Sequence, residues 1–138
     1  MNKIFFLSVF FSLSMLGCSK SDDIEKVESS NAKIEYQKNL QQQIDVAKSG
    51  VKIPENMGSP EMALCAASAM KNGQGIGVYK VWVNELNSRY QKNYPEKTKT
   101  EIDQYTSERI EDKLNSLKSK GYATQTAFLE FYKVNCQS

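Results

Sequence analysis

The sequence predicts an all-α protein, a small helical bundle of four core helices plus an N-terminal helix, stapled by one disulfide. Hydrophobic side chains recur at helical spacing in successive segments after residue 30. Helix-start and helix-stop residues separate these segments, among them Ser59-Pro60, Thr98 and Gly121. Two cysteines, Cys65 and Cys136, lie in this region and can form the disulfide.

Composition excludes several classes of function. The 138 residues include 18 Lys and Arg, 16 Asp and Glu, and no His, which gives a formal net charge of +2. Without His, metal sites built on imidazole and catalysis with a His base are excluded. The nearly balanced charge gives no overall attraction to nucleic acid. We therefore expect no metal, no free cofactor and no nucleic acid among the ligands.

Residues 1–17 are predicted to be a signal peptide. Lys3 precedes an apolar run over residues 4–16, and about 13 residues are too few for a spanning helix, which needs about 20. The run ends in Met15-Leu16-Gly17-Cys18, which resembles the lipobox of bacterial lipoproteins. The alternative is an ordinary secretory signal followed by an incidental cysteine.

The lipobox resemblance implies that Cys18 is lipidated. Its sulfur would carry a diacylglycerol and its amine an acyl chain such as palmitate, enough to hold the protein on a membrane. In lipoproteins of this type, Ser19 in place of Asp after the cysteine implies the periplasmic face of the outer membrane rather than the inner membrane. Residues 18–30 are predicted to be a flexible tether because they are almost entirely polar.

Residues 31–49 are predicted to form an amphipathic helix. They contain no Pro or Gly, and Ile34, Leu40, Ile44 and Ala47 fall on one stripe. This helix is either the first packed helix of the domain or a stalk that binds a separate partner.

The predicted disulfide-stapled helical domain, residues 59–138, begins with a helix over residues 60–72. Ser59 is a good N-cap, and Pro60 suits the first helical position. Small side chains on one side of this helix would let another helix approach closely. The residues expected on that side are Ala63, Ala66, Ala67 and Met70.

The segment after Gly73 combines two ambiguous patterns. The alternate glycines of residues 73–77 are followed by no Lys-Ser or Lys-Thr, so we expect a hinge between helices and no bound nucleotide. Residues 76–83 are rich in β-branched and aromatic side chains, which favour a strand. A helical stripe through the same region favours a helix ending near Tyr94, and we predict the helix. The stripe consists of Tyr79, Trp82, Val83, Leu86 and Tyr90.

Two further helices complete the predicted bundle. Thr98-Lys99-Thr100-Glu101 has the pattern of a capping box that begins a helix ending near Lys120, and Gly121 is a good stop. Thr124 or Thr126 begins a last helix that ends at Cys136. The predicted apolar stripe of the longer helix is Ile102, Tyr105, Ile110, Leu114 and Leu117.

Cys65 and Cys136 are predicted to form a disulfide in the oxidising periplasm. The bridge would close a loop of about 72 residues. The lost entropy of the unfolded chain is expected to stabilise the fold by about 4 kcal/mol. The alternatives are two buried free thiols or, since there is no Cys-x-x-Cys, a less favoured redox pair. Cys65-Ala66-Ala67, Tyr79, Trp82 and Cys136 together resemble a broad group of small exported helical proteins of Gram-negative bacteria. That resemblance implies a fold and a compartment, and no activity.

Four aromatic residues form a candidate binding surface for a protein or a glycan. Tyr79, Trp82, Tyr90 and Tyr94 offer large contact areas with polar edges. Core packing is the alternative for the first three. Tyr94 lies at a helix end and is the member that we expect to be exposed.

We predict no catalytic residues. Glu108, Glu111 and Asp112 lie about one helical turn apart, as paired acids for glycoside chemistry would need. Arg109 and Lys113 lie among them and favour a solvated face instead. We therefore predict a non-enzymatic lipoprotein that binds a periplasmic protein partner, such as an immunity or exclusion protein. The alternatives are a structural subunit of an envelope assembly, docked through residues 31–49, and a cell-wall glycan enzyme.

Overall fold

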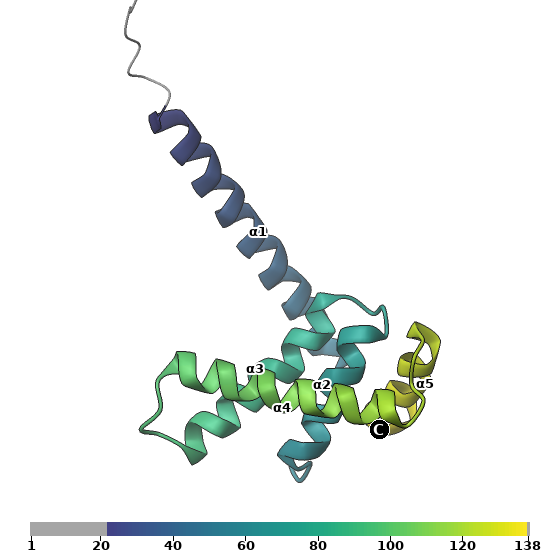
Figure 1. The fold of residues 1–138 in the computed structure, drawn as a ribbon. Coiled ribbons are helices and arrows are strands. Elements are labelled where there is room, and N and C mark those ends of the chain that lie inside the picture. Colours follow the sequence, from purple (N-terminus) through teal and green to yellow (C-terminus); the bar gives the residue numbers. More distant parts are fainter. Residues whose placement is uncertain (1–21, 138) are drawn as a thin grey trace, which may run out of the picture. The chain divides into compact units, whose positions relative to one another are not determined.

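The computed structural model describes the backbone of residues 22–137 and the side chains of residues 30–137. These residues form five α-helices, and no strand occurs among them (Figure 1). Contacts divide the chain into two units, residues 1–34 and residues 35–138. The all-α prediction is confirmed for the described residues. The helices are α1 (Asp22–Gly50), α2 (Ser59–Lys71), α3 (Ile76–Asn93), α4 (Lys99–Ser119) and α5 (Gln125–Cys136).

The first helix, α1, begins earlier than the sequence predicts. Residues 22–30, expected to be part of a flexible tether, are helical, and the predicted helix over residues 31–49 continues from them. Polarity alone does not oppose a helix: this stretch has no Gly or Pro, and acidic residues at its start favour the positive end of the helix dipole. The predicted signal peptide and Cys18 lie outside the described residues.

The part of α1 that belongs to the second unit packs against the start of α3. Ile44 is 6% exposed and Leu40 and Ala47 are half-buried, whereas Ile34 on the same predicted stripe is exposed. A Cβ on Gly77 would overlap the backbone carbonyl of Gln43, so this close approach of the two helices requires glycine. Residues 40–47 of α1 therefore pack on the start of α3 through one face, whereas residues 35–39 are exposed.

Helix α2 is the centre of the bundle, in contact with α3, α4 and α5. Its side chains are small enough that α2 is buried on almost every side. Met70 was predicted on the buried side and is instead 40% exposed. It lies in the last turn, where the neighbouring Gly73 and Gly75 have no side chains to cover it. The buried residues of α2 are Met62, Ala63, Cys65, Ala66, Ala67, Ser68 and Ala69.

Helix termini agree closely with the capping signals. Helix α2 begins at Ser59, with Gly58 rather than Ser59 as its N-cap. Before α4, the side chain of Thr98 accepts a hydrogen bond from the backbone N–H of Glu101, and a carboxylate oxygen of Glu101 accepts one from the backbone N–H of Thr98 at 2.8 Å. The Thr98 hydroxyl also donates to this carboxylate at 2.9 Å, and the two bonds that Thr98 donates, from its backbone and its hydroxyl, lower the pKa of Glu101. Gly121 follows α4 with a φ of 93°, and Thr124, not Thr126, caps α5.

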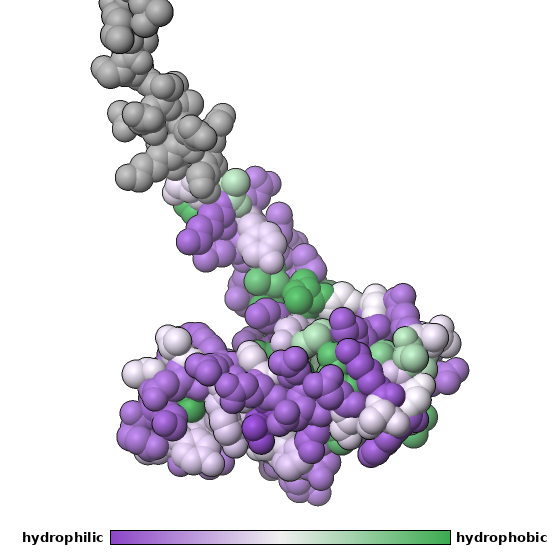
Figure 2. Space-filling view, in the orientation of Figure 1, coloured by the Kyte–Doolittle hydropathy of each residue, from purple (hydrophilic) through white to green (hydrophobic). Residues whose placement is uncertain are grey.

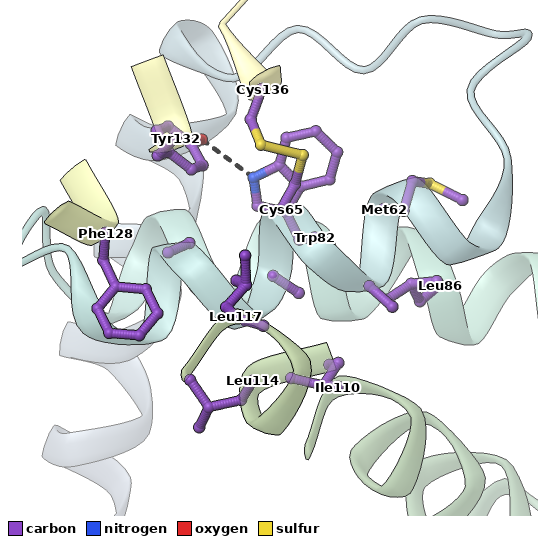
Figure 3. Close-up of a cluster of buried hydrophobic side chains, with 14 of the residues drawn as sticks. Met62, Cys65, Trp82, Leu86, Ile110, Leu114, Leu117, Phe128, Tyr132 and Cys136 are labelled. Carbon is purple, nitrogen blue, oxygen red and sulfur yellow. Dashed lines mark hydrogen bonds between the residues drawn. A yellow bond between two sulfur atoms is a disulfide. The ribbon is translucent and has the colours of Figure 1, made fainter. Parts of the chain in front are cut away.

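Helix α3 resolves the choice between helix and strand for residues 76–83 in favour of a helix. Its apolar stripe faces the core, where Trp82 and Leu86 are fully buried (Figure 3). Burial of a continuous stripe outweighs the weak strand preference of the individual residues. Trp82 Nε1 donates a hydrogen bond of 3.0 Å to the hydroxyl oxygen of Tyr132 on α5, and the two rings meet edge to face.

A disulfide joins α2 to the end of α5. The sulfur atoms of Cys65 and Cys136 are 2.09 Å apart and their Cα atoms 5.7 Å apart. The predicted bridge is therefore confirmed. It lies beside the pair formed by Trp82 and Tyr132, so one covalent link and one buried hydrogen bond hold α5 to the other helices (Figure 3).

The buried side of α4 contains a polar residue that hydrophobic periodicity did not reveal. Ile102, Ile110, Leu114 and Leu117 are buried as predicted, whereas Tyr105 is only half-buried. Thr106 is 1% exposed, and its hydroxyl oxygen has no hydrogen-bond partner among the described residues. A buried hydroxyl without a partner destabilises the folded state.

Thr106→Val is expected to raise the free energy of unfolding by about 1 kcal/mol, because it removes an unpaired buried hydroxyl and keeps a similar shape. Urea denaturation followed by circular dichroism measures the change. Thr100→Val, at an exposed position of the same helix, is the matched control and should have little effect. A loss of stability in Thr106→Val would mean that the hydroxyl is paired.

Candidate functional site

The four aromatic residues predicted as a binding surface divide between core and surface. Trp82 is 0% exposed and Tyr90 is 7% exposed. Tyr79 is half-buried, and Tyr94 is 40% exposed, as expected for its place at the helix end. Trp82 therefore belongs to the core and cannot contribute to a surface, because its side of α3 faces α2 and α5.

A tyrosine cluster forms between the end of α3 and the first half of α4. The rings of Tyr90 and Tyr105 meet edge to face with centroids 4.8 Å apart, and those of Tyr94 and Tyr105 are 6.0 Å apart. Edge-to-face contacts of this kind stabilise a fixed arrangement of the rings. Tyr105, predicted only as a core residue, thus links the two tyrosines that α3 places near its end.

A cavity of about 320 Å³, here called the tyrosine pocket, lies beside this cluster. The start of α2, the end of α3 and the middle of α4 each form part of its wall. Four residues of α4 take part because positions i, i+4, i+7 and i+8 share one face of a helix. The pocket is lined by Ser59, Pro60, Ala63, Tyr90, Tyr105, Arg109, Asp112 and Lys113.

The charged groups of the tyrosine pocket are held by specific contacts. The guanidinium of Arg109 lies 5.3 Å from the ring centroid of Tyr105, as in a cation–π contact, and its Nη2 is 3.2 Å from a carboxylate oxygen of Asp112. Lys113 is half-buried and forms no ion pair within residues 30–137. Burial raises the pKa of Tyr90, and the neighbouring Tyr105 raises it further. Tyr90 is therefore a neutral hydrogen-bond donor around pH 7.

A second cavity, of about 580 Å³, lies between α1 and the start of α3. No charged side chain lines it, and its polar groups are the amides of Asn and Gln. Part of its wall comes from the glycine-rich segment of residues 73–77, of which 73–75 join α2 to α3 and 76–77 are the first residues of α3. The lining residues are Asn39, Gln42, Gln43, Val46, Ala47, Gln74, Gly75, Gly77 and Val78. The tyrosine pocket has the more varied chemistry and is the stronger candidate site.

The acidic residues of α4 are spread over an exposed face. Glu108 and Glu111 are exposed, and Glu108 accepts a hydrogen bond from Gln104. The tyrosine pocket holds one carboxylate, Asp112, whereas glycoside hydrolysis uses two facing acids. Within the described part of the chain, no group of three or more Cys, Asp or Glu side chains is placed to hold a metal ion.

None of the helices between residues 22 and 137 has an apolar stretch long enough to cross a membrane. The surface visible in Figure 2 is mainly hydrophilic, with smaller hydrophobic areas between the polar side chains. On this face, binding through one broad apolar patch is not favoured.

Comparisons with protein-family models, curated proteins and solved structures found no match to the chain. Function is therefore inferred from the residues and their geometry.

The sequence did not predict that the residues lining the tyrosine pocket lie close together. Arg109 and Lys113 were assigned to a solvated face, and Ser59 only to a helix start. The available signal was the helical spacing of Tyr105, Arg109 and Lys113, which puts one aromatic ring and two cations on the same face. Their meeting with Tyr90 depends on how α3 packs on α4, which no local pattern specifies.

Proposed function

We propose that the protein is a lipoprotein, anchored through Cys18 to the periplasmic face of the outer membrane, whose helical domain binds a protein partner without catalysis. The observation that carries this proposal is the Cys65–Cys136 bridge in a domain that follows an export-type leader. Structural disulfides persist in oxidising compartments such as the periplasm. The bridge and the predicted leader thus favour the same compartment.

The tyrosine pocket and its rim support binding to a protein. Tyrosine and arginine are enriched at the energetically important positions of protein interfaces, and Tyr90, Tyr105 and Arg109 lie together here. Tyr94, exposed beside them, extends the aromatic surface. A small bridged domain tethered to the envelope suits an immunity or exclusion protein that neutralises an incoming toxin or blocks an entry machine.

A second candidate function is that of a structural subunit of an envelope assembly. Tyr36 and Val46 are large exposed side chains on α1, and they favour docking of this helix on another protein. Crosslinks that map to residues 36–46 would support this function, whereas crosslinks around Tyr94 would support binding at the tyrosine pocket.

The anchor is tested by replacing Cys18 with Ser in cells. We expect wild-type protein to incorporate labelled palmitate and to migrate with outer membranes on a density gradient, because the acyl chains hold it there. Cys18→Ser should lose both the label and the membrane association. Cys136→Ser, the same chemical change in the domain, should keep the label. Equal membrane association of wild type and Cys18→Ser would contradict the lipid anchor.

The partner is identified by crosslinking in cells that express the full chain with a C-terminal tag, followed by mass spectrometry. One stoichiometric protein, captured with wild type and reduced with Cys18→Ser, would support the binding role. If it is a toxin, expression should protect cells from that toxin alone. Recovery of only abundant envelope proteins, equal in both samples, would contradict the proposed function.

A further inference from the structure

The polar part of the tyrosine pocket consists mainly of hydrogen-bond donors and positive charge. Arg109 and Lys113 are two cations against the single carboxylate of Asp112, which leaves one net positive charge in the lining. The carboxylate of Asp112 forms an ion pair with Arg109, with Nη2 and Oδ2 3.2 Å apart. Lys113 therefore remains as the charge that no described carboxylate neutralises. Glu61, in the first turn of α2, is exposed and does not line the pocket.

Arg109 and Asp112 are surface side chains, 45% and 61% exposed, that contact each other at the pocket. Arg109 lies between the ring of Tyr105 and the carboxylate of Asp112, and Tyr105 packs against Tyr90. Lys113 is half-buried, so its stem has less freedom than that of a fully exposed lysine. The contact with Tyr105 restricts the guanidinium of Arg109, and its exposed part stays accessible to a ligand.

The hydroxyl groups add neutral donors to the two cations. Tyr90 keeps its proton around pH 7, and the hydroxyl of Ser59, at the start of α2, lies within hydrogen-bond reach of it, so the two act as a pair. A group that accepts several hydrogen bonds and carries negative charge complements this lining. Charge-assisted hydrogen bonds to a carboxylate are among the strongest that side chains make, and arginine matches its planar shape.

We propose that the tyrosine pocket binds a carboxylate of the protein partner, presented by an Asp or Glu side chain in an acidic segment. This inference rests on the proposed protein-binding function. A volume of about 320 Å³ is at the small end of ligand pockets and suits one acidic side chain with its immediate neighbours. Tyr94, whose exposed ring lies 6.0 Å from that of Tyr105, would contact the residues beside that side chain.

A pair of peptides tests the charge preference. The full chain is purified from membranes in neutral detergent and titrated with acetyl-Ser-Glu-Tyr-Glu-Ser-amide or with the same peptide carrying Gln for Glu. We expect the acidic peptide to shift the NMR signals of Tyr105, Arg109 and Lys113. The Gln peptide should bind about tenfold more weakly, because it lacks the charge-assisted bonds. Equal binding of the two peptides, or no shift at these residues, would overturn the carboxylate site.

A matched pair of variants tests the residues. Lys113→Gln should weaken binding of the acidic peptide about tenfold by removing the unpaired cation. Lys118→Gln, the same change at an exposed position of α4, should bind as wild type does. Circular dichroism melting of both variants checks that the fold is unchanged. Equal weakening by the two substitutions would mean nonspecific attraction between charges and would overturn the site.

Crosslinking in cells separates failure of this inference from failure of the proposed function. Loss of the identified partner with Lys113→Gln, but not with Lys118→Gln, would support the carboxylate site. Capture of that partner by Lys113→Gln at the wild-type level would reject the site and leave the binding function standing. Selective binding of the acidic peptide without any captured partner would reject the function and leave the site standing.

Discussion

Replacing Cys65 or Cys136 with Ser is expected to lower the free energy of unfolding by about 4 kcal/mol. The bridge joins residues separated by 71 positions in the sequence, and it reduces the conformational freedom of the unfolded chain between them. Domains of this size are commonly stable by about 5–15 kcal/mol, so this loss is a large fraction of the total. We expect a marked fall in Tm for either variant.

Denaturation in urea and thermal melting both measure this effect. Wild type treated with dithiothreitol should melt with the variants, because reduction breaks the same bond without changing the composition. Cys18→Ser, a Cys-to-Ser change that leaves residues 59–138 unaltered, is the control and should not lower the stability of the domain. Identical melting of oxidised and reduced wild type would contradict a stabilising role for the bridge.

Trp82→Ala is expected to cost about 3–5 kcal/mol, the range for truncating a buried aromatic side chain. Trp82 is fully buried among the core residues drawn in Figure 3, and its ring meets that of Tyr132 edge to face. Truncation would leave a cavity and would also remove the hydrogen bond between α3 and α5. Val134→Ala, at an exposed position of α5, is the control and should change stability by less than about 0.5 kcal/mol.

Tyr132→Phe separates the hydrogen bond from the packing of the rings. It keeps the aromatic ring and removes the hydroxyl oxygen that accepts from Trp82 Nε1, which is left buried without this partner. We expect a loss of about 1–3 kcal/mol. A double-mutant cycle with Trp82→Phe, measured in urea, gives the coupling energy of the pair. Additive losses would mean that the hydrogen bond makes no net contribution.

The helices and the bridge could be predicted because their signals are local or chemical. The capping box at Thr98 and the glycine at Gly121 depend only on residues close to them in the sequence. The two ends of α4 could therefore be predicted from those residues alone. The pairing of Cys65 with Cys136 followed from the expected compartment and from the two thiols left if Cys18 is lipidated as predicted.

Other features depend on which surfaces meet, and local patterns do not contain that information. The burial of Thr106 is decided by neighbouring helices, and the exposure of Met70 by the glycines that follow α2, rather than by periodicity. The close approach of α1 to Gly77 is likewise a property of two packed helices. The tyrosine pocket could not be predicted for the same reason, because it needs three helices to converge.

The pairing of Cys65 with Cys136 bears on the proposed lipidation of Cys18. Three cysteines permit three pairings, Cys18–Cys65, Cys18–Cys136 and Cys65–Cys136, of which the fold uses the last. Thiol–disulfide exchange requires a thiolate, and a thioether has none to offer. The proposed lipid on Cys18 would therefore act as a protecting group as well as an anchor, since it leaves two thiols with a single possible partner each.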